Sequence, residues 1–207
     1  MKHSITVERT AHYYVQQPSQ EVKSILFVIH GYAQLAKDFI TEFEQLKSSS
    51  TLVIAPEALS KFYNKNNEPV ANWMTSHERE SEIKDYINYL NNLTSHLQTE
   101  FVNTPISVLG FSQGVSTILR WVTQTKLTIK DIHLCAGTIP PEFTKSILSS
   151  LKNSSFYYYF GSDDKLLRPA KAKEQIQLLT GMEMDVKAIF YRGRHEIPKE
   201  LISLLTA

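Results

Sequence analysis

One serine between two glycines stands at the junction of a strand-like and a helix-like run. The stretch GFSQG, residues 110–114, follows the apolar run PISVL and precedes VSTILRW. A tight strand-to-helix turn would expose the hydroxyl of Ser112 as a nucleophile. A helix-capping serine is the simpler interpretation, since serines commonly cap helices. A cap requires neither flanking glycine, so the pattern favours a nucleophile.

A serine nucleophile needs a base and an acid, and both residue types follow other strand-like runs. Asp163 and Asp164 come after FYYYF, and His195 comes after KAIFYRGR. Five of the seven glycines also lie at such ends: Gly31, Gly110, Gly114, Gly161 and Gly193. The order serine, aspartate, histidine is the order expected for a nucleophile on a strand-to-helix elbow. The residues therefore predict a Ser-His-Asp hydrolase.

The candidates have competing interpretations. Asp163 competes with Asp164 for the role of the acid, and either could be a plain turn residue. His195 could instead cap or pair at the surface. His30, which directly precedes Gly31 after the run ILFVI, is a second candidate base, although a histidine there more often braces the turn by hydrogen bonding.

The elements that must position these residues are strands alternating with helical patterns. The strand-like runs are ITVERTAHYYV, SILFVIH, TLVIAP, PISVLGF, DIHLCAG, FYYYFG and DVKAIFYRG. Near-continuous apolar strands indicate a mostly parallel sheet covered on both faces, while the mixed first run suits an antiparallel edge. We predict an α/β fold, a three-layer α/β/α sandwich of the α/β-hydrolase type, with ligands bound beyond the carboxyl ends of the strands.

Apolar residues at helical spacing predict three core-facing helices. Their stripes are Leu35, Phe39, Phe43 and Leu46, then Ile83, Ile87, Leu90, Leu93 and Leu97, then Val115, Ile118, Leu119 and Val122. Residues 56–77 show neither helical nor strand periodicity and predict a long loop, which could be a mobile surface excursion or a cover over a pocket.

Composition limits the classes of function. The 207 residues suit one domain over 1–207, and a net charge of +1 without basic runs argues against nucleic-acid binding. No apolar run is long enough for a signal peptide or a membrane span, so we expect a soluble, cytoplasmic chain. The single cysteine, Cys135, suits a buried core position. Monomer and homodimer are both compatible with the sequence.

Four stretches resemble the phospholipase/carboxylesterase family of α/β-hydrolases, which includes acyl-protein thioesterase-like enzymes. They are FVIHGYAQ, GFSQGV, GSDDKLL and YRGRHEIP. The resemblance extends from about Ile25 to the last helix, and its G-x-x-D-x-L-L spacing assigns the acid to Asp164 rather than Asp163. The chain carries no metal-binding or nucleotide-binding motif, and the expected chemistry requires neither a metal nor an organic cofactor.

The expected mechanism uses Ser112 as nucleophile, His195 as base and Asp164 as the residue that holds the histidine tautomer. A tetrahedral oxyanion needs hydrogen-bond donors. The backbone N–H groups of Gln113 and Tyr32 are the expected pair, because the residue after the nucleophile and the loop after an early strand supply them in such folds.

The expected substrate is a small-molecule carboxylic ester or thioester with an acyl chain of roughly C2 to C8. No fixed charge is evident near the strand ends to hold a phosphate. The apolar side chains expected to bind the substrate there are Tyr32, Phe62, Tyr63, Trp73, Leu166 and Leu167. A lysophospholipase and a peptidase are alternatives on the same fold. A catalytically silent binding module is the alternative from another class.

Overall fold

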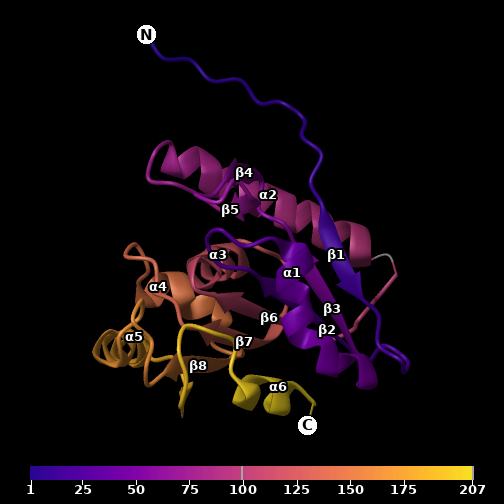
Figure 1. Cartoon of the computed structure of the whole chain (residues 1–207), viewed down its shortest axis with the longest axis vertical. Coiled ribbons are helices and arrows are strands. Elements are labelled where there is room, and N and C mark those ends of the chain that lie inside the picture. Colours follow the sequence, from indigo (N-terminus) through magenta and orange to yellow (C-terminus); the bar gives the residue numbers. More distant parts are fainter. Residues whose placement is uncertain (99, 207) are drawn as a thin grey trace.

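A computed structural model describes residues 1–98 and 100–206 and contains one seven-stranded sheet (Figure 1). Its strand order is β1-β3-β2-β6-β7-β8-β9, and only β1 runs antiparallel to its neighbour. The strands are β1 (Tyr13–Gln16), β2 (Ser24–Ile29), β3 (Thr51–Pro56), β6 (Ile106–Phe111), β7 (Ile129–Cys135), β8 (Ser155–Gly161) and β9 (Val186–Tyr191). This confirms the predicted fold class and the antiparallel edge.

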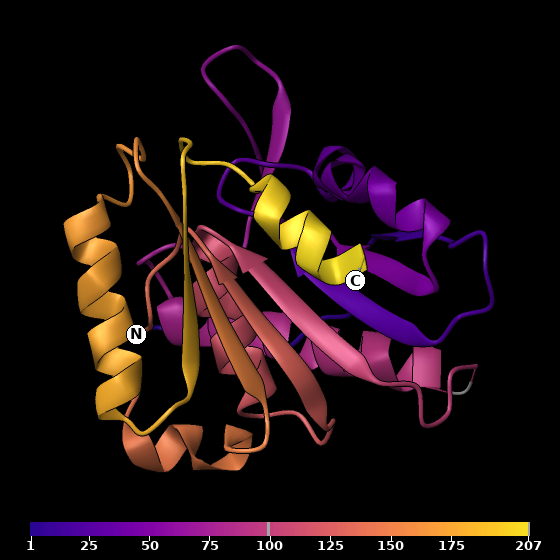
Figure 2. The same cartoon turned by 90° about the horizontal axis from the view of Figure 1, so that it is seen from below.

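Helices cover both faces of the sheet (Figure 2). One face packs against α2 (Arg79–Gln98), α3 (Gln113–Val122) and α5 (Pro169–Gly181), and α4 (Lys145–Leu148) continues into the 3₁₀ turn η2 (Ser149–Leu151). The other face packs against α1 (Ala36–Phe39), the 3₁₀ segment η1 (Ile40–Ser48) and α6 (Lys199–Thr206). An apolar core therefore lies on each face of the sheet. The central strands are apolar on both sides because both of their faces are buried.

The predicted helical stripes are buried, but one predicted helix is divided. Leu90 and Leu97 on α2 and Ile118 on α3 lie in the core, as predicted. The first stripe instead spans α1 and η1, with Phe43 at a kink of φ −105° and ψ 15°. A 3₁₀ segment keeps near-helical spacing over a short run, so the apolar pattern alone does not separate it from an α-helix.

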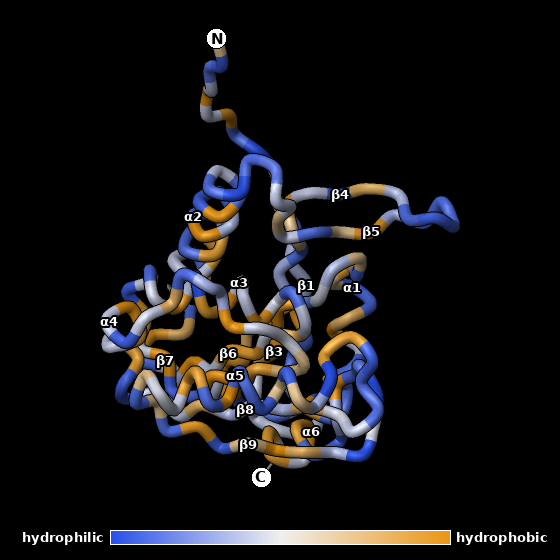
Figure 3. The backbone as a smooth tube through the Cα atoms, turned by 90° about the vertical axis from the view of Figure 1, so that its left-hand side faces the viewer, coloured by the Kyte–Doolittle hydropathy of each residue, from blue (hydrophilic) through white to orange (hydrophobic). Residues whose placement is uncertain are grey.

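The prediction of a long loop over residues 56–77 was wrong. The segment contains an antiparallel hairpin, β4 (Ser60–Tyr63) and β5 (Pro69–Asn72), that projects from the body with a hydrophilic turn (Figure 3). The side chain of Asn64 accepts hydrogen bonds from the backbone N–H groups of Asn66 and Glu68 and so forms the turn. Strands of four residues are too short to show a clear period of two.

The first strand is shorter than predicted. Pairing with β3 begins at Tyr13, and residues 1–10 lie exposed, extending away from the sheet (Figure 1). The alternation in ITVERTA therefore has no neighbouring strand, and a strand forms only where a ladder partner exists.

Candidate active site

Ser112 lies at the junction of β6 and α3 in a strained backbone conformation. Its φ of 53° and ψ of −115° place it outside the regions that non-glycine residues usually adopt. Its N–H donates to the carbonyl of Cys135 at 2.8 Å, and its side chain makes no capping bond within the described chain. Strain of this kind is maintained only where the surrounding structure imposes it. The helix-cap interpretation therefore does not explain the serine.

Gly137 is a neighbour of the elbow that the sequence analysis did not single out. A β-carbon at this position would lie 2.3 Å from the carbonyl oxygen of Ser112, so only glycine fits without a shift. The buried hydroxyl of Tyr158 donates to the Gly137 carbonyl. Its position directly after the strand-like run DIHLCA was the available signal, since glycines mark most strand ends at this edge.

Asp164 and His195 are brought together by the loops that follow β8 and β9. Asp164 Oδ2 lies 2.7 Å from His195 Nδ1, and Asp164 Oδ1 accepts from the backbone N–H groups of Leu166 and Leu167, each at 2.8 Å. Asp164 is 3% exposed, and its three hydrogen bonds satisfy the buried carboxylate and hold it in place. A histidine held at Nδ1 by a buried carboxylate leaves Nε2 for proton transfer.

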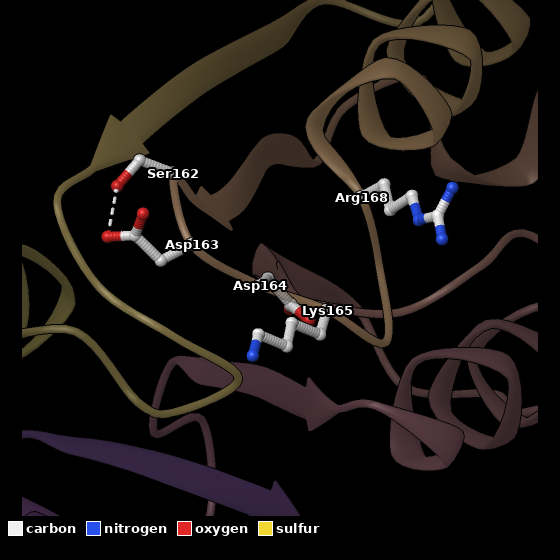
Figure 4. A pocket seen from close by; sticks show the side chains of 5 residues that line it. All are labelled: Ser162, Asp163, Asp164, Lys165 and Arg168. Atoms are coloured by element: carbon white, nitrogen blue, oxygen red, sulfur yellow. Dashed lines mark hydrogen bonds between the residues drawn. The ribbon is translucent and has the colours of Figure 1, made fainter.

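The neighbouring carboxylate points elsewhere. Figure 4 shows Asp163 beside Ser162, whose hydroxyl donates to Asp163 Oδ2 at 2.9 Å. These residues, with Asp164, Lys165 and Arg168, line a pocket of about 470 Å³. Two cationic side chains, those of Lys165 and Arg168, therefore line the same pocket as Asp164, although no fixed charge near the strand ends was evident from the sequence.

The ring of His195 also contacts the strand that carries the elbow. Its centroid lies 4.9 Å from that of Phe111, the residue directly before Ser112. The loop after β9 and the end of β6 are thus in contact. The fold gathers the serine, the histidine and the aspartate of the predicted triad at one edge of the sheet.

His30 is a structural residue. Its Nδ1–H donates to the Gly31 carbonyl at 2.7 Å, and its Nε2 accepts from the Ala58 N–H at 3.1 Å, so both ring nitrogens are engaged. Burial lowers its pKa from 6.5 to about 4. A buried, neutral histidine with both nitrogens engaged braces the turn, as its position before a glycine suggested.

The residues expected to contact substrate divide into two groups. Phe62 packs on the exposed ring of Tyr32 with centroids 5.4 Å apart, and Tyr63 and Leu166 are exposed. Trp73 and Leu167 are only 2% and 5% exposed. The buried pair therefore offers little surface to a ligand and belongs to the core.

Two further findings concern ligands. Among the described residues, no three His, Cys, Asp or Glu side chains are arranged to hold a metal ion. In the same part of the chain, every helix is too short or too polar to cross a bilayer.

The family of the chain is shown by comparison with known proteins. The phospholipase/carboxylesterase family model matches residues 10–206, and the chain belongs to this family. It is a hydrolase of the esterase class with the α/β-hydrolase fold. The sequence has no significant match among curated proteins.

Solved structures with the same fold include acyl-protein thioesterase 2 from Zea mays. That structure has a TM-score of 0.75 and 17% identity, and the match covers 95% of this chain and 98% of that one. Esterase PE8 matches with a TM-score of 0.72, 18% identity and coverage of 96% and 97%. A carboxylesterase from Bacillus cereus matches with a TM-score of 0.69, 14% identity and coverage of 95% and 92%. At these identities the likeness supports the fold.

Proposed function

We propose that this protein hydrolyses carboxylic esters of short to medium acyl chains with Ser112, His195 and Asp164 as its catalytic triad. The observation that carries the proposal is the hydrogen bond between Asp164 Oδ2 and His195 Nδ1 at 2.7 Å. It fixes the tautomer in which Nε2 is unprotonated and able to accept a proton.

The chemical steps follow from these groups. His195 Nε2 removes the proton as Ser112 Oγ attacks the ester carbonyl carbon, and the negative charge moves to the carbonyl oxygen. The imidazolium then donates that proton to the departing alkoxide, which leaves the acyl group on the serine. Water then attacks the carbonyl carbon of this acyl-enzyme as the same histidine takes its proton. The histidine gives that proton to Ser112 Oγ as the bond between serine and acyl group breaks, which releases the acid and restores the enzyme.

The oxyanion would be bound by two backbone N–H groups, those of Gln113 and Tyr32. Gln113 begins α3, where N–H groups lack intrahelical partners, and Tyr32 lies in the loop after β2. Each such donor contributes on the order of 10²- to 10³-fold in rate.

The acyl chain would contact the aromatic surface formed by Tyr32 and Phe62. The exposed side chains of Tyr63 and Leu166 are further candidates for this contact. An alkyl chain gains about 0.8 kcal/mol for each CH₂ that it buries, until the apolar surface ends. We therefore propose a preference for roughly C2 to C8 esters.

The test is a hydrolysis screen over p-nitrophenyl esters of increasing acyl length, with acyl thioesters and lysophospholipids alongside. Ser112→Ala should remove turnover and labelling by a serine-directed fluorophosphonate together, while leaving the thermal midpoint nearly unchanged. Retained turnover in the purified variant would contradict the triad. A wild-type protein that neither turns over esters nor reacts with the phosphonate would instead be a silent binding module.

A further inference from the structure

The short segment Ala71–Met74, at the end of strand β5, is hydrogen-bonded to the loop after β2 and to the first residue of α3, which carry the proposed oxyanion donors. On one side it meets the loop after β2. The N–H of Ala33 donates to the Ala71 carbonyl at 3.0 Å, and the N–H of Ala71 donates to the Gln34 carbonyl at 3.1 Å. These two bonds form an antiparallel bridge directly beyond Tyr32.

On the other side the segment meets the side chain of Gln113. Gln113 Oε1 accepts from the Trp73 N–H at 3.1 Å, and Nε2 donates to Asn72 Oδ1 at 2.7 Å and to the Met74 carbonyl at 2.9 Å. One amide thus makes three hydrogen bonds to three consecutive residues. Its backbone N–H belongs to the residue after Ser112.

The segment is fixed to the core as well. Asn72 is 4% exposed and its Oδ1 also accepts from the Met74 N–H at 3.3 Å. The indole N–H of Trp73 donates to the His30 carbonyl at 3.0 Å, at the end of β2. The Gly31 N–H donates to Gln34 Oε1 at 2.7 Å, which orders the loop that leads to Tyr32.

We propose that Ala71–Met74 sets the separation of the two oxyanion donors, and that the side-chain amide of Gln113 is the positioning residue that links them. This inference rests on the proposed function, because it concerns the same oxyanion. Oxyanion donors act through their position where the charge develops. A support that bonds to both donor-carrying segments should therefore affect the rate more than it affects substrate binding.

The chemistry of the amide suggests an isosteric test. In Gln113→Glu the carboxylate still accepts from the Trp73 N–H but cannot donate to Asn72 Oδ1 or to the Met74 carbonyl. We expect kcat to fall about 10- to 100-fold and KM to change less than about 3-fold, since interactions made in the transition state are the ones weakened.

A thiono ester distinguishes loss of oxyanion binding from general disorder. Its sulfur is larger and accepts hydrogen bonds poorly, so a well-formed oxyanion hole favours the oxo ester over the thiono ester. We expect the oxo-to-thiono ratio of kcat/KM for p-nitrophenyl butyrate and its thiono analogue to fall about 10-fold in Gln113→Glu, following the loss of donor alignment.

Gln16→Glu is the matched control. Gln16, on the edge strand β1, is also buried, and its Nε2 donates to the Phe43 carbonyl at 2.8 Å. This variant should lower the thermal midpoint through its lost donor while kcat and the oxo-to-thiono ratio stay at wild-type values.

The partner side provides a second pair of variants, which keeps the test informative if Gln113→Glu does not fold. Asn72→Leu removes the acceptor of the Gln113 amide and should reproduce the loss of kcat. Asn72→Asp retains an acceptor oxygen and should keep kcat within about 3-fold of wild type.

Unchanged kcat in Gln113→Glu, or a lower kcat with an unchanged oxo-to-thiono ratio, would overturn the positioning role. Equal kcat in Asn72→Leu and Asn72→Asp would do the same. Failure of the proposed function looks different: the wild-type protein itself would then show no turnover that depends on Ser112.

Discussion

A β-carbon on Gly114 would lie 2.2 Å from the carbonyl oxygen of Ile29. The first turn of α3 therefore packs directly against the end of β2, and this close approach sets the elbow beside the loop that carries Tyr32. The second glycine of the GFSQG motif is therefore needed for the close packing of α3 on the end of β2.

Gly114→Ala should disrupt this contact, because the nearest atoms belong to backbone and cannot rotate away. We expect a loss of about 1–3 kcal/mol in the free energy of unfolding, as for other overpacked sites, together with a fall in kcat. Thermal denaturation and ester hydrolysis measure the two effects. Gly181→Ala is the control, because its β-carbon would meet nothing within 4 Å. Equal midpoints and rates for the two variants would show that the contact is unimportant.

Asp164→Asn should damage catalysis far more than Asp163→Asn. The amide would favour the wrong histidine tautomer, at a cost of about 10⁴ in kcat in a comparable triad, whereas the side chain of Asp163 bonds only to Ser162 among the described residues. Steady-state kinetics on one activated ester compare the variants. The reverse ranking would transfer the role of the acid to Asp163.

Phe62→Ala should change the acyl-length profile. Loss of the ring that packs on Tyr32 removes apolar surface, so kcat/KM should fall more for a C8 ester than for a C2 ester. Rates across the p-nitrophenyl series measure this change. Tyr14→Ala, at an exposed tyrosine on strand β1, is the control. If kcat/KM falls equally at all chain lengths, the hairpin does not contact the acyl chain. Shortening residues 64–68 gives a second test: an unchanged acyl-length profile would lead to the same conclusion.

A buried histidine should make the protein sensitive to acid. Burial lowers the pKa of His133 from 6.5 to about 3, so the unfolded chain binds the proton more readily than the native one. The free energy of unfolding should therefore fall as the pH is lowered from 6.5 toward 3, by at most 1.36 kcal/mol per pH unit for this group.

His133→Phe tests this expectation. The variant removes the titrating ring while keeping a ring to stack on Tyr157, whose centroid lies 4.8 Å away. It should be less stable at pH 7, because the hydroxyl of Tyr159 loses its partner at 2.9 Å, yet less sensitive to acid. Urea denaturation at several pH values measures both quantities, with the exposed His3→Gln as control. An acid dependence as steep as that of the wild type would exclude His133 as its source.

The sequence by itself determined the architecture. Apolar runs with flanking glycines identified the sheet strands, and helical stripes such as that ending at Leu97 identified the faces that pack on them. These signals are local, since they depend on residues close together along the chain. The same locality made Ser112 the candidate nucleophile, because its elbow is formed within five residues.

Tertiary structure decided what depends on residues distant in sequence. From the residue types alone the two adjacent aspartates were equivalent, and it was the family resemblance that favoured Asp164. The path of the loop after β8 shows that Asp164, and not Asp163, meets the imidazole of His195. Trp73 and Leu167 are apolar in the sequence whether they face a substrate or the core. Their burial follows from how the hairpin and the loop after β8 pack.

The support of the proposed oxyanion site was hidden in the sequence for the same reason. The amide of Gln113 bonds to residues about 40 positions earlier, and Gly137 meets Ser112 across two strand ends. Such bonds depend on strand register and on turn geometry, and both are set by the whole sheet. The sequence determines which chemical groups are present. Their hydrogen bonds form only when distant segments pack to within about 3 Å of each other.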